Sequence, residues 1–378
     1  MSGPDYGEEH QQLRRTLRGF VDKEITPFVE AWEEAESFPR ALYGKAADIG
    51  LLGLGFPEAL GGTMSDPFAT IVACEELARS GSGGVAAGLM THTIAIPPVV
   101  ALGSDDLKER VVKPVLRGEK IAALAITEPS GGSDVANLRT TARRDGEHYV
   151  VNGSKTFITS GMRADFLTVA VRTGGPGMGG VSILVIDGDT PGLERTPLKK
   201  MGWWASDTAT LYFDDCRVPV TNLVGEENQG FFGLMLNFNH ERLSIAGTAY
   251  AFAKVCFDEA LAWAQERQTF NKPLIKHQVI RHKLVDMATQ LASTKAFLEQ
   301  VARLLKAGEQ PVAEICMLKN TATRCMEYCA KEAVQILGGA GYIRGQKSER
   351  IYRETKVLAI GGGAEEIMKE LAAKQLGW

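Results

Sequence analysis

The chain has 378 residues, which is enough for two or three domains and a substantial hydrophobic core. Its 42 Lys and Arg against 46 Asp and Glu give a net charge of −4, so no chain-wide field attracts nucleic acid or an acidic membrane. Glycine is the compositional oddity, with 41 residues where about 7% of a chain is usual. We therefore expect many backbone positions that need positive φ or the close approach of a neighbour.

No apolar run reaches the roughly 18–20 residues that span a bilayer, and the opening segment MSGPDYGEEH is acidic where a signal peptide is basic and then apolar. These features predict a cytoplasmic protein without a membrane segment. The six cysteines form no CxxC pair, and His92, His148 and His282 have no partner at metal-ligand spacing. We expect reduced thiols and no metal site.

Residues 1–118 are predicted to form a helical domain. Apolar side chains recur three and four positions apart between Leu13 and Ile25. Asp66 precedes a proline, which is typical of an N-cap with Pro at the first helical position, and Ser104 precedes two acidic residues in the same way.

Residues 119–226 change to a period of two and are predicted to form a mainly antiparallel β domain. Phe166–Thr173 and Val181–Asp187 are rich in β-branched residues. The pair Asn152-Gly153 favours a type I′ hairpin turn. Gly175–Gly180 fits GxGxxG, but a strand and not a helix follows it, so we interpret it as a loop between strands and not as a dinucleotide site.

Residues 227–378 return to the helical period and are predicted to form a four-helix bundle. From Ile280 to Leu305, apolar residues alternate spacings of four and three, which describes one stripe on a long helix. Cys325 and Cys329 fall on a similar stripe and are expected to be buried. The expected helices are Phe231–Arg267, Ile280–Leu305, Ile315–Ile336 and Ser348–Leu371. The predicted fold class is α+β.

One loop has a composition suited to ligand binding. In Ile126–Asp134, ITEPSGGSD, a strand ends, a proline turns the chain, and two glycines precede Ser133 and Asp134. Such a loop can bring backbone N–H groups and hydroxyls against an anionic or amide-rich ligand. Taken alone, it could equally be an ordinary Gly-Ser turn.

With five further segments in order along the chain, this loop resembles the acyl-CoA dehydrogenase family. The matching segments are Phe56-Pro57-Glu58 with Gly61-Gly62, Ile126–Asp134, Asn152–Thr159, Arg267–Phe270 with His277-Gln278, Gln335–Tyr342, and Glu349–Arg353. Together they extend over essentially the whole chain.

The resemblance implies bound FAD, a homotetramer, and an electron-transferring flavoprotein as electron acceptor. One group of residues would contact the flavin ring and pyrophosphate: Leu124, Ile126, Thr127, Gly132, Ser133, Phe157 and Thr159. A second group would reach the dinucleotide from a neighbouring subunit: Arg267, Phe270, His277, Gln278, Gln335, Gly338 and Gly339. The family more often has Trp at position 157, and Phe keeps the apolar face but loses an N–H donor.

The position of the catalytic base departs from the common family pattern. Most relatives carry a glutamate where this chain has Gly362, within Gly361-Gly362-Gly363-Ala364. In the isovaleryl-, long-chain- and citronellyl-type branch the glutamate lies on the first bundle helix before an arginine, where this chain has Glu241 and Arg242. Glu241 is the candidate base, with Glu365 and Glu366 as rivals. Candidate substrate contacts are Ser133, Asn239, Arg242 and Gly362.

The resemblance implies α,β-dehydrogenation of an acyl-CoA to the trans-2-enoyl thioester. Such a site needs a carboxylate in a dry pocket and hydrogen-bond donors on the thioester oxygen. The alternatives are an acyl-CoA oxidase or flavin monooxygenase of the same fold, a dehydrogenase of acyl-carrier-protein thioesters, and a relative that binds flavin without dehydrogenating. A non-enzymatic DNA-binding relative is disfavoured by the acidic charge balance.

Overall fold

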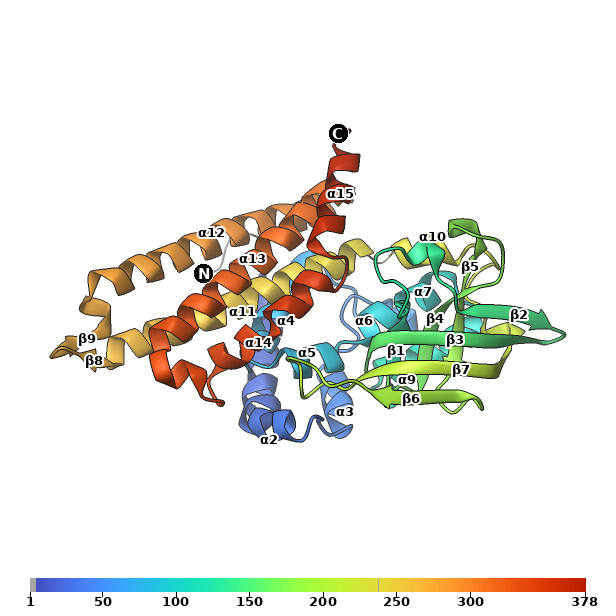
Figure 1. The fold of residues 1–378 in the computed structure, drawn as a ribbon, viewed down its shortest axis with the longest axis horizontal. Coiled ribbons are helices and arrows are strands. Elements are labelled where there is room, and N and C mark those ends of the chain that lie inside the picture. The colour runs from blue at the N-terminus through green and yellow to red at the C-terminus, as the bar shows by residue number, and fades with distance from the viewer. Residues whose placement is uncertain (1–4, 237) are drawn as a thin grey trace.

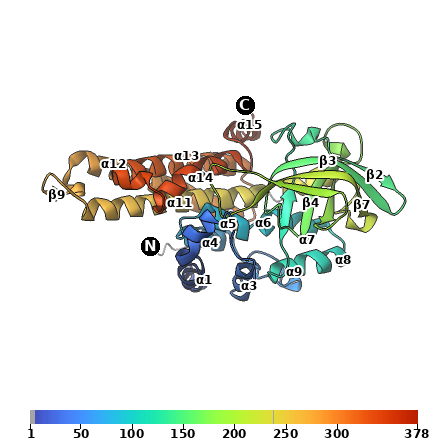
Figure 2. The ribbon, with the colours of Figure 1, turned by 60° about the horizontal axis from the view of Figure 1, so that its bottom comes forward.

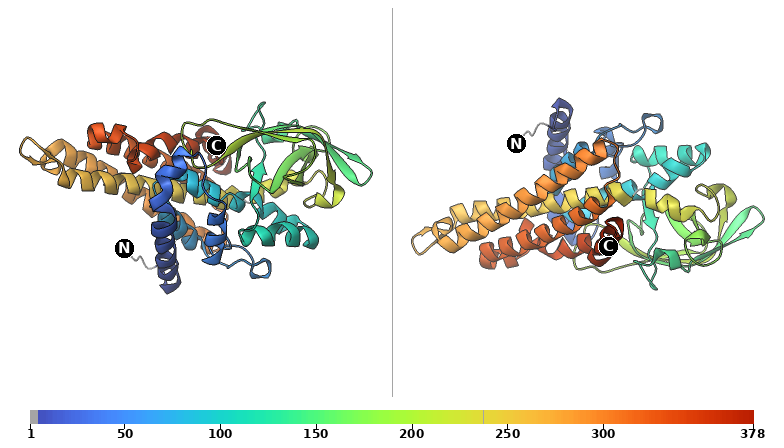
Figure 3. Two further views of the ribbon diagram at one scale, coloured as in Figure 1. Left: turned by 90° about the horizontal axis from the view of Figure 1, so that it is seen from below. Right: turned by 90° about the horizontal axis from the view of Figure 1, so that it is seen from above.

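The computed structural model describes residues 5–236 and 238–378, apart from the side chains of Leu236 and Asn239. The molecule is elongated, with long helices at one end and a β-sheet at the other (Figure 1). The short N-terminal helices pack beside the junction of these two parts (Figures 2 and 3). The predicted succession of helices, sheet and bundle is confirmed, and the exact domain boundaries at residues 118 and 226 stay predictions.

Two of the N-terminal helices begin at the predicted caps. Asp66 Oδ1 accepts hydrogen bonds from the N–H groups of Phe68 and Ala69, at 3.0 and 3.1 Å, and Ser104 Oγ accepts from Leu107 N at 3.2 Å. The helices are α1 (Glu8–Phe20), α2 (Val29–Glu34), α3 (Ala41–Asp48), α4 (Pro67–Ala78), α5 (Gly83–Leu89), α6 (His92–Ala95), α7 (Pro97–Leu102), α8 (Asp105–Leu107) and α9 (Lys113–Leu116).

No single helix in the described part of the chain is long and apolar enough to cross a membrane. By length and composition alone, the pair Gly83–Leu89 and His92–Leu102, bent by 48°, passes the same test together.

The middle of the chain forms a seven-stranded sheet with the order β1-β4-β2-β3-β7-β6, and β5 pairs with β4. The strands are β1 (Ala122–Ala125), β2 (Thr141–Asp145), β3 (His148–Thr159), β4 (Phe166–Arg172), β5 (Val181–Asp187), β6 (Leu193–Pro197) and β7 (Thr208–Pro219). β1 runs parallel to β4, and the long pairings are antiparallel, as predicted. Alternate residues of β4 and β5 enter two cores, one within the sheet and one shared with helices α6 and α7.

The predicted hairpin turn at Asn152-Gly153 is wrong. These residues lie inside β3, where the register against β7 shifts between Val151 and Gly153, and the turn lies instead at Gly146, with φ +60°. Asn152 bonds to the neighbouring strand through Asp215, so its side chain does not serve a turn. The GxGxxG segment is a loop between β4 and β5, as predicted.

The C-terminal part contains α10 (Gly230–Leu236), α11 (Phe238–Glu266), α12 (Gln278–Lys306), α13 (Val312–Leu337), α14 (Lys347–Ile360) and α15 (Glu365–Gln375). The apolar stripe of α12 is buried as predicted, and Cys325 and Cys329 lie in the same core. The single helix predicted over Ser348–Leu371 is wrong, because the chain breaks between α14 and α15. Gly362 and Gly363 adopt φ +65° and +106° there, which side chains other than glycine rarely tolerate.

Candidate active site

Glu241 and Gly362, the two positions considered for the base, meet in space. Glu241 lies in the first turn of α11, and Gly362 lies in the break between α14 and α15. A Cβ atom placed on Gly362 would lie 3.5 Å from Oε1 of Glu241 and 2.4 Å from Cδ1 of Ile245. The carboxylate of Glu241 therefore reaches the place that a side chain at position 362 would enter, and Ile245 fills part of that space.

The surroundings of Glu241 make its carboxylate more basic than an exposed one. Burial raises the pKa of Glu241, while the charges of Arg242 and Lys319 oppose that rise. Arg242 is itself buried, its guanidinium lies over the ring of Phe238, and its Nε donates to the carbonyl oxygen of Gly362 at 3.3 Å. Arg242 thus fixes the glycine segment beside the candidate base.

The rival carboxylates have other partners. Glu365 accepts a hydrogen bond from Arg324 and pairs with Lys369 at 2.8 Å, and these contacts lower the pKa of Glu365 to about 2. A carboxylate with so low a pKa is a poor general base at neutral pH. Glu366 is exposed on the first turn of α15. Their contacts favour Glu241 over both.

The two segments predicted to contact flavin lie side by side and share a buried ion pair. Lys155 Nζ donates to Glu128 Oε1 at 2.8 Å and to the carbonyl oxygen of Ile126 at 2.9 Å, and Thr156 N donates to Thr127 O at 2.8 Å. Burial of Glu128 works to raise its pKa, but its hydrogen bond to Lys155 and the charge there outweigh burial and lower the pKa to about 2. The pair holds the end of β1 against β3.

An exposed aromatic side chain and a tightly folded loop lie near this pair. Phe157 is 69% exposed with φ +61°, at a register shift in β3 that turns its side chain outward. A Cβ on Gly132 would lie only 3.2 Å from Cγ2 of Thr127, so the loop folds closely on itself there. Gly132 and Ser133 are exposed, whereas Leu124, Ile126, Thr127 and Thr159 are half-buried. The hydrogen bond from Thr156 N to Thr127 O thus joins the two segments that carry the first predicted flavin group.

The second predicted group lies elsewhere in the chain. Arg267 and Phe270 belong to the hairpin of β8 (Gln268–Thr269) and β9 (Lys272–Pro273), and Phe270 is 91% exposed at the turn. His277 is half-buried and bonds to Thr269, while the other members are exposed: Gln278, Gln335, Gly338 and Gly339. Figure 1 places this hairpin at the end of the bundle away from the sheet. One chain does not bring the two groups together.

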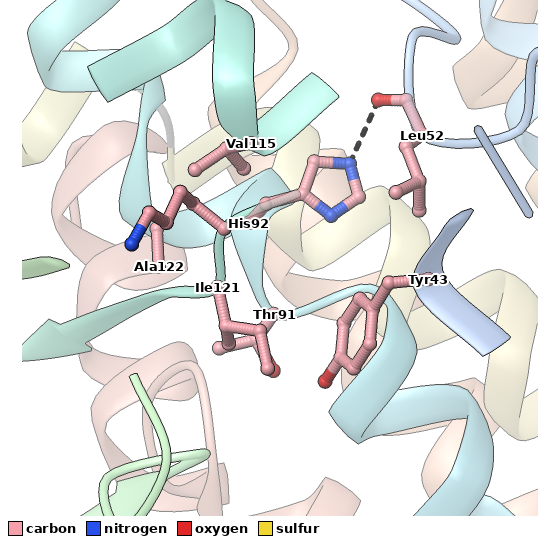
Figure 4. A pocket seen from close by; sticks show the side chains of 8 residues that line it. Tyr43, Leu52, Thr91, His92, Val115, Ile121 and Ala122 are labelled. Carbon is pink, nitrogen blue, oxygen red and sulfur yellow. Dashed lines mark hydrogen bonds between the residues drawn. The ribbon is translucent and has the colours of Figure 1, made fainter. Parts of the chain in front are cut away.

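A small gap in the N-terminal core is not a second site. Tyr43, Thr91, His92 and Ile121 surround it, and they leave no room for a water molecule (Figure 4). The imidazole of His92 bonds to the carbonyl oxygen of Leu52 at 2.9 Å, and burial lowers the pKa of His92 to about 4. His92 is therefore a neutral histidine of the core.

Comparison with known protein families shows which family this chain belongs to. The N-terminal, middle and C-terminal domain models of acyl-CoA dehydrogenase match residues 7–119, 123–216 and 228–377. The chain belongs to the acyl-CoA dehydrogenase family. It is an oxidoreductase that acts on CH–CH groups, and its cofactor is FAD. The exposed Phe157 beside the glycine-containing loop fits the planar ring of that cofactor.

Several relatives cover nearly all of this acyl-CoA dehydrogenase. It is 38% identical to the acyl-CoA dehydrogenase AFT10-1 of Alternaria alternata, over 98% of this chain and 92% of that protein. It is 35% identical to the mitochondrial long-chain specific acyl-CoA dehydrogenase of Rattus norvegicus, over 98% and 87%. The structure of acyl-CoA dehydrogenase from Geobacillus kaustophilus has a TM-score of 0.95 at 37% identity, covering 100% of both chains.

Two further solved structures carry information on flavin and on electron transfer. A glutaryl-CoA dehydrogenase from Mycobacterium smegmatis in complex with FADH2 has a TM-score of 0.91 at 26% identity, over 98% of this chain and 95% of that one. A chain in the structure of the electron transferring flavoprotein of Acidaminococcus fermentans has a TM-score of 0.94 at 30% identity, over 99% of both.

Sequence reasoning missed Lys319, Ile245 and the Glu128–Lys155 pair as parts of the site. A lysine between Ile315 and Ala322 on the buried stripe of α13 was a usable signal, because a lone charge on an apolar face needs a partner. Glu128 and Lys155 lay inside the two flavin motifs, but nothing in their spacing pairs them. The side chain of Asn239 lies outside the described residues.

Proposed function

We propose that this acyl-CoA dehydrogenase oxidises an acyl-CoA to its trans-2-enoyl thioester, with Glu241 as the base that removes the α-proton. The observation that carries the proposal is the placement of the Glu241 carboxylate at the point that a side chain on Gly362 would reach. FAD, when bound, accepts the hydride that leaves the β-carbon. The proton from the α-carbon then resides on the carboxylate of Glu241.

The chain's own groups support each part of this reaction. Burial makes the carboxylate of Glu241 more basic, so it can take a proton from a weakly acidic carbon. Among the residues that the structure describes, none accepts a hydrogen bond from the N–H of Gly362, so this group is free to donate to the thioester oxygen. Arg242 holds the carbonyl side of the same residue. Ser133, on the exposed loop, and Asn239 remain proposed substrate contacts.

A second copy of the chain would complete the FAD site. The hairpin with Arg267 and Phe270 lies far from the sheet within one chain, and the Phe270 side chain, 91% exposed, is free to contact a neighbouring subunit. We therefore retain the homotetramer, in which the hairpin of one subunit would reach the FAD bound by another. The electron-transferring flavoprotein is the proposed acceptor, supported by the similarity to a chain in the structure of that flavoprotein from Acidaminococcus fermentans.

The substrate is proposed to be a long or branched acyl-CoA. The support is the pairing of Glu241 with Gly362, which follows the pattern of the branch of the family whose substrates carry long or branched acyl groups. An acyl group attached to an acyl carrier protein, in place of CoA, is the second candidate substrate.

The test is anaerobic reduction of the FAD-loaded enzyme by butyryl-, octanoyl-, palmitoyl- and isovaleryl-CoA. We expect at least one to bleach the flavin of the wild type, and Glu241→Gln to be about 10²–10⁴-fold slower while dithionite still reduces it. Glu366→Gln, an exposed glutamate on α15, is the matched control and should keep the wild-type rate. An unbleached wild type refutes the reaction, and a fully active Glu241→Gln refutes the base. Rapid peroxide formation in air would favour an oxidase.

A further inference from the structure

Lys319 is a fully buried lysine next to the proposed catalytic centre. It lies on α13, its side chain is 0% exposed, and its Nζ donates to the carbonyl oxygens of Ala359 and Gly363 at 3.1 and 2.6 Å. These two carbonyls flank the break between α14 and α15. A buried ammonium group is costly unless other groups compensate its charge, and here two carbonyl oxygens accept its hydrogen bonds.

The glycine segment that Lys319 holds makes no side-chain contacts of its own. Gly361, Gly362 and Gly363 have no side chains, and glycine loses more conformational freedom on folding than any other residue. Donors from α11 and α13 fix the segment by its carbonyls: Arg242 bonds to Gly362, Lys319 to both flanks, and Asn320 Nδ2 to Glu365 O at 3.0 Å. Together with the hydrogen bond from Gly361 N to Val357 O at 2.8 Å, these contacts fix the position of the Gly362 N–H.

Lys319 also acts on Glu241 through its charge. Burial raises the pKa of Glu241, and Arg242 from α11 and Lys319 from α13 are the cations that oppose it. Two further titratable groups act here: Cys316 from α13 acts on both Lys319 and Arg242, and Glu365 from α15 acts on Lys319. Burial, followed by the repulsion of Arg242, lowers the pKa of Lys319 to about 8, so its ammonium form still predominates at pH 7.

We infer that Lys319 is a positioning residue of the proposed dehydrogenation, which holds the glycine segment against Glu241 and places a positive charge near its carboxylate. This inference rests on the proposed role of Glu241. Lys319 acts through the carbonyls of Ala359 and Gly363 and through its charge, without contact to the acyl group.

The test compares four variants of the FAD-loaded enzyme. Lys319→Met removes donor and charge, Lys319→Gln keeps a donor without the charge, and Lys319→Arg keeps the charge. Asn320→Ala is the matched control, because it releases the same segment at Glu365 without changing any charge. The rate of flavin reduction by the acyl-CoA that reduces the wild type fastest is measured against pH for each.

We expect both neutral variants to raise the midpoint of the pH–rate profile by about one unit, since a nearby opposite charge shifts a pKa by this order. At pH values below both midpoints their rates should fall about tenfold, and the rate of Lys319→Gln should recover at high pH. Lys319→Arg should return the wild-type midpoint, and Asn320→Ala should keep that midpoint even if its rate falls. An unmoved midpoint in Lys319→Gln, or an equal shift in Asn320→Ala, overturns the inference.

A second measurement separates this inference from the proposed function. The carbonyl stretch of protonated Glu241, identified by its loss in Glu241→Gln, is titrated by infrared spectroscopy without any acyl-CoA. Its midpoint should rise in Lys319→Gln as the kinetic midpoint does, and no rise refutes the effect of the charge. If no acyl-CoA reduces the wild type, the proposed function and the positioning role both fall, whatever the infrared result. If Lys319→Met does not fold, Lys319→Gln decides.

Discussion

The proposed base should be movable from Glu241 back to position 362, but only if Ile245 is made smaller. The perturbation is the pair Glu241→Gln and Gly362→Glu, with and without Ile245→Ala. A side chain at position 362 must start 2.4 Å from Cδ1 of Ile245, well inside contact distance, and must accept φ +65°. The same side chain would start 3.5 Å from the present carboxylate oxygen, so its own carboxylate can approach the place that Glu241 serves.

The costs can be worked from these contacts. A left-handed backbone costs a residue other than glycine about 1–2 kcal/mol. Ile245 is half-buried, so its truncation should cost less than the 2–5 kcal/mol of a fully buried isoleucine, about 1–2 kcal/mol. The triple variant should therefore lose about 2–4 kcal/mol, which an enzyme with ordinary stability of 5–15 kcal/mol survives.

The assay is stopped-flow reduction of the flavin, with thermal unfolding to confirm that each variant folds. We expect Glu241→Gln/Gly362→Glu to stay within a few-fold of the rate of Glu241→Gln, because the clash with Ile245 displaces the new side chain. Adding Ile245→Ala should raise that rate at least about tenfold, whereas Glu241→Gln/Ile245→Ala, the matched control, should gain nothing. If the double variant is already as fast as the triple, Ile245 does not obstruct position 362. If the triple variant gains nothing, the two positions do not serve one point.

Two further predictions concern the ion pair of Glu128 and the hairpin that carries Phe270. Glu128 has a pKa of about 2, below the ordinary value of about 4.5, so its contribution to stability is present above pH 4.5 and is lost as the pH falls towards 2. Urea unfolding of wild type and Glu128→Gln should therefore differ most above pH 5 and converge near pH 2, and a constant difference would contradict the role of the ion pair. Phe270→Ala should weaken FAD retention about tenfold, measured by flavin fluorescence. Because the Phe270 side chain is 91% exposed, its loss should have little effect on the unfolding of a single chain. Unchanged FAD retention would remove the hairpin from the site.

Much of the fold follows from local patterns in the sequence. The caps at Asp66 and Ser104 and the stripe of α12 depend on residues within a few turns, and the structure confirms them. The Asn152-Gly153 pair shows the limit of such signals, because a bond to Asp215, 63 positions along the chain, uses the asparagine within a strand. Likewise, the helical period of Ser348–Leu371 continued across glycines that break the helix.

The sequence predicts which residues form the candidate site, but only partly how they are arranged in space. The sequence shows that position 362 lacks a glutamate and that position 241 has one. That these two positions lie close together results from the packing of the bundle and cannot be read from the sequence. Arg242 bonds to Gly362 across 120 positions, and Lys319 reaches the same segment from a third helix. A base supplied from α11 therefore depends on contacts that hold a segment without side chains in place. In the proposed site, Gly362 lacks a carboxylate but retains an N–H group, and residues of α11 and α13 supply the charge and the contacts that hold the glycine segment.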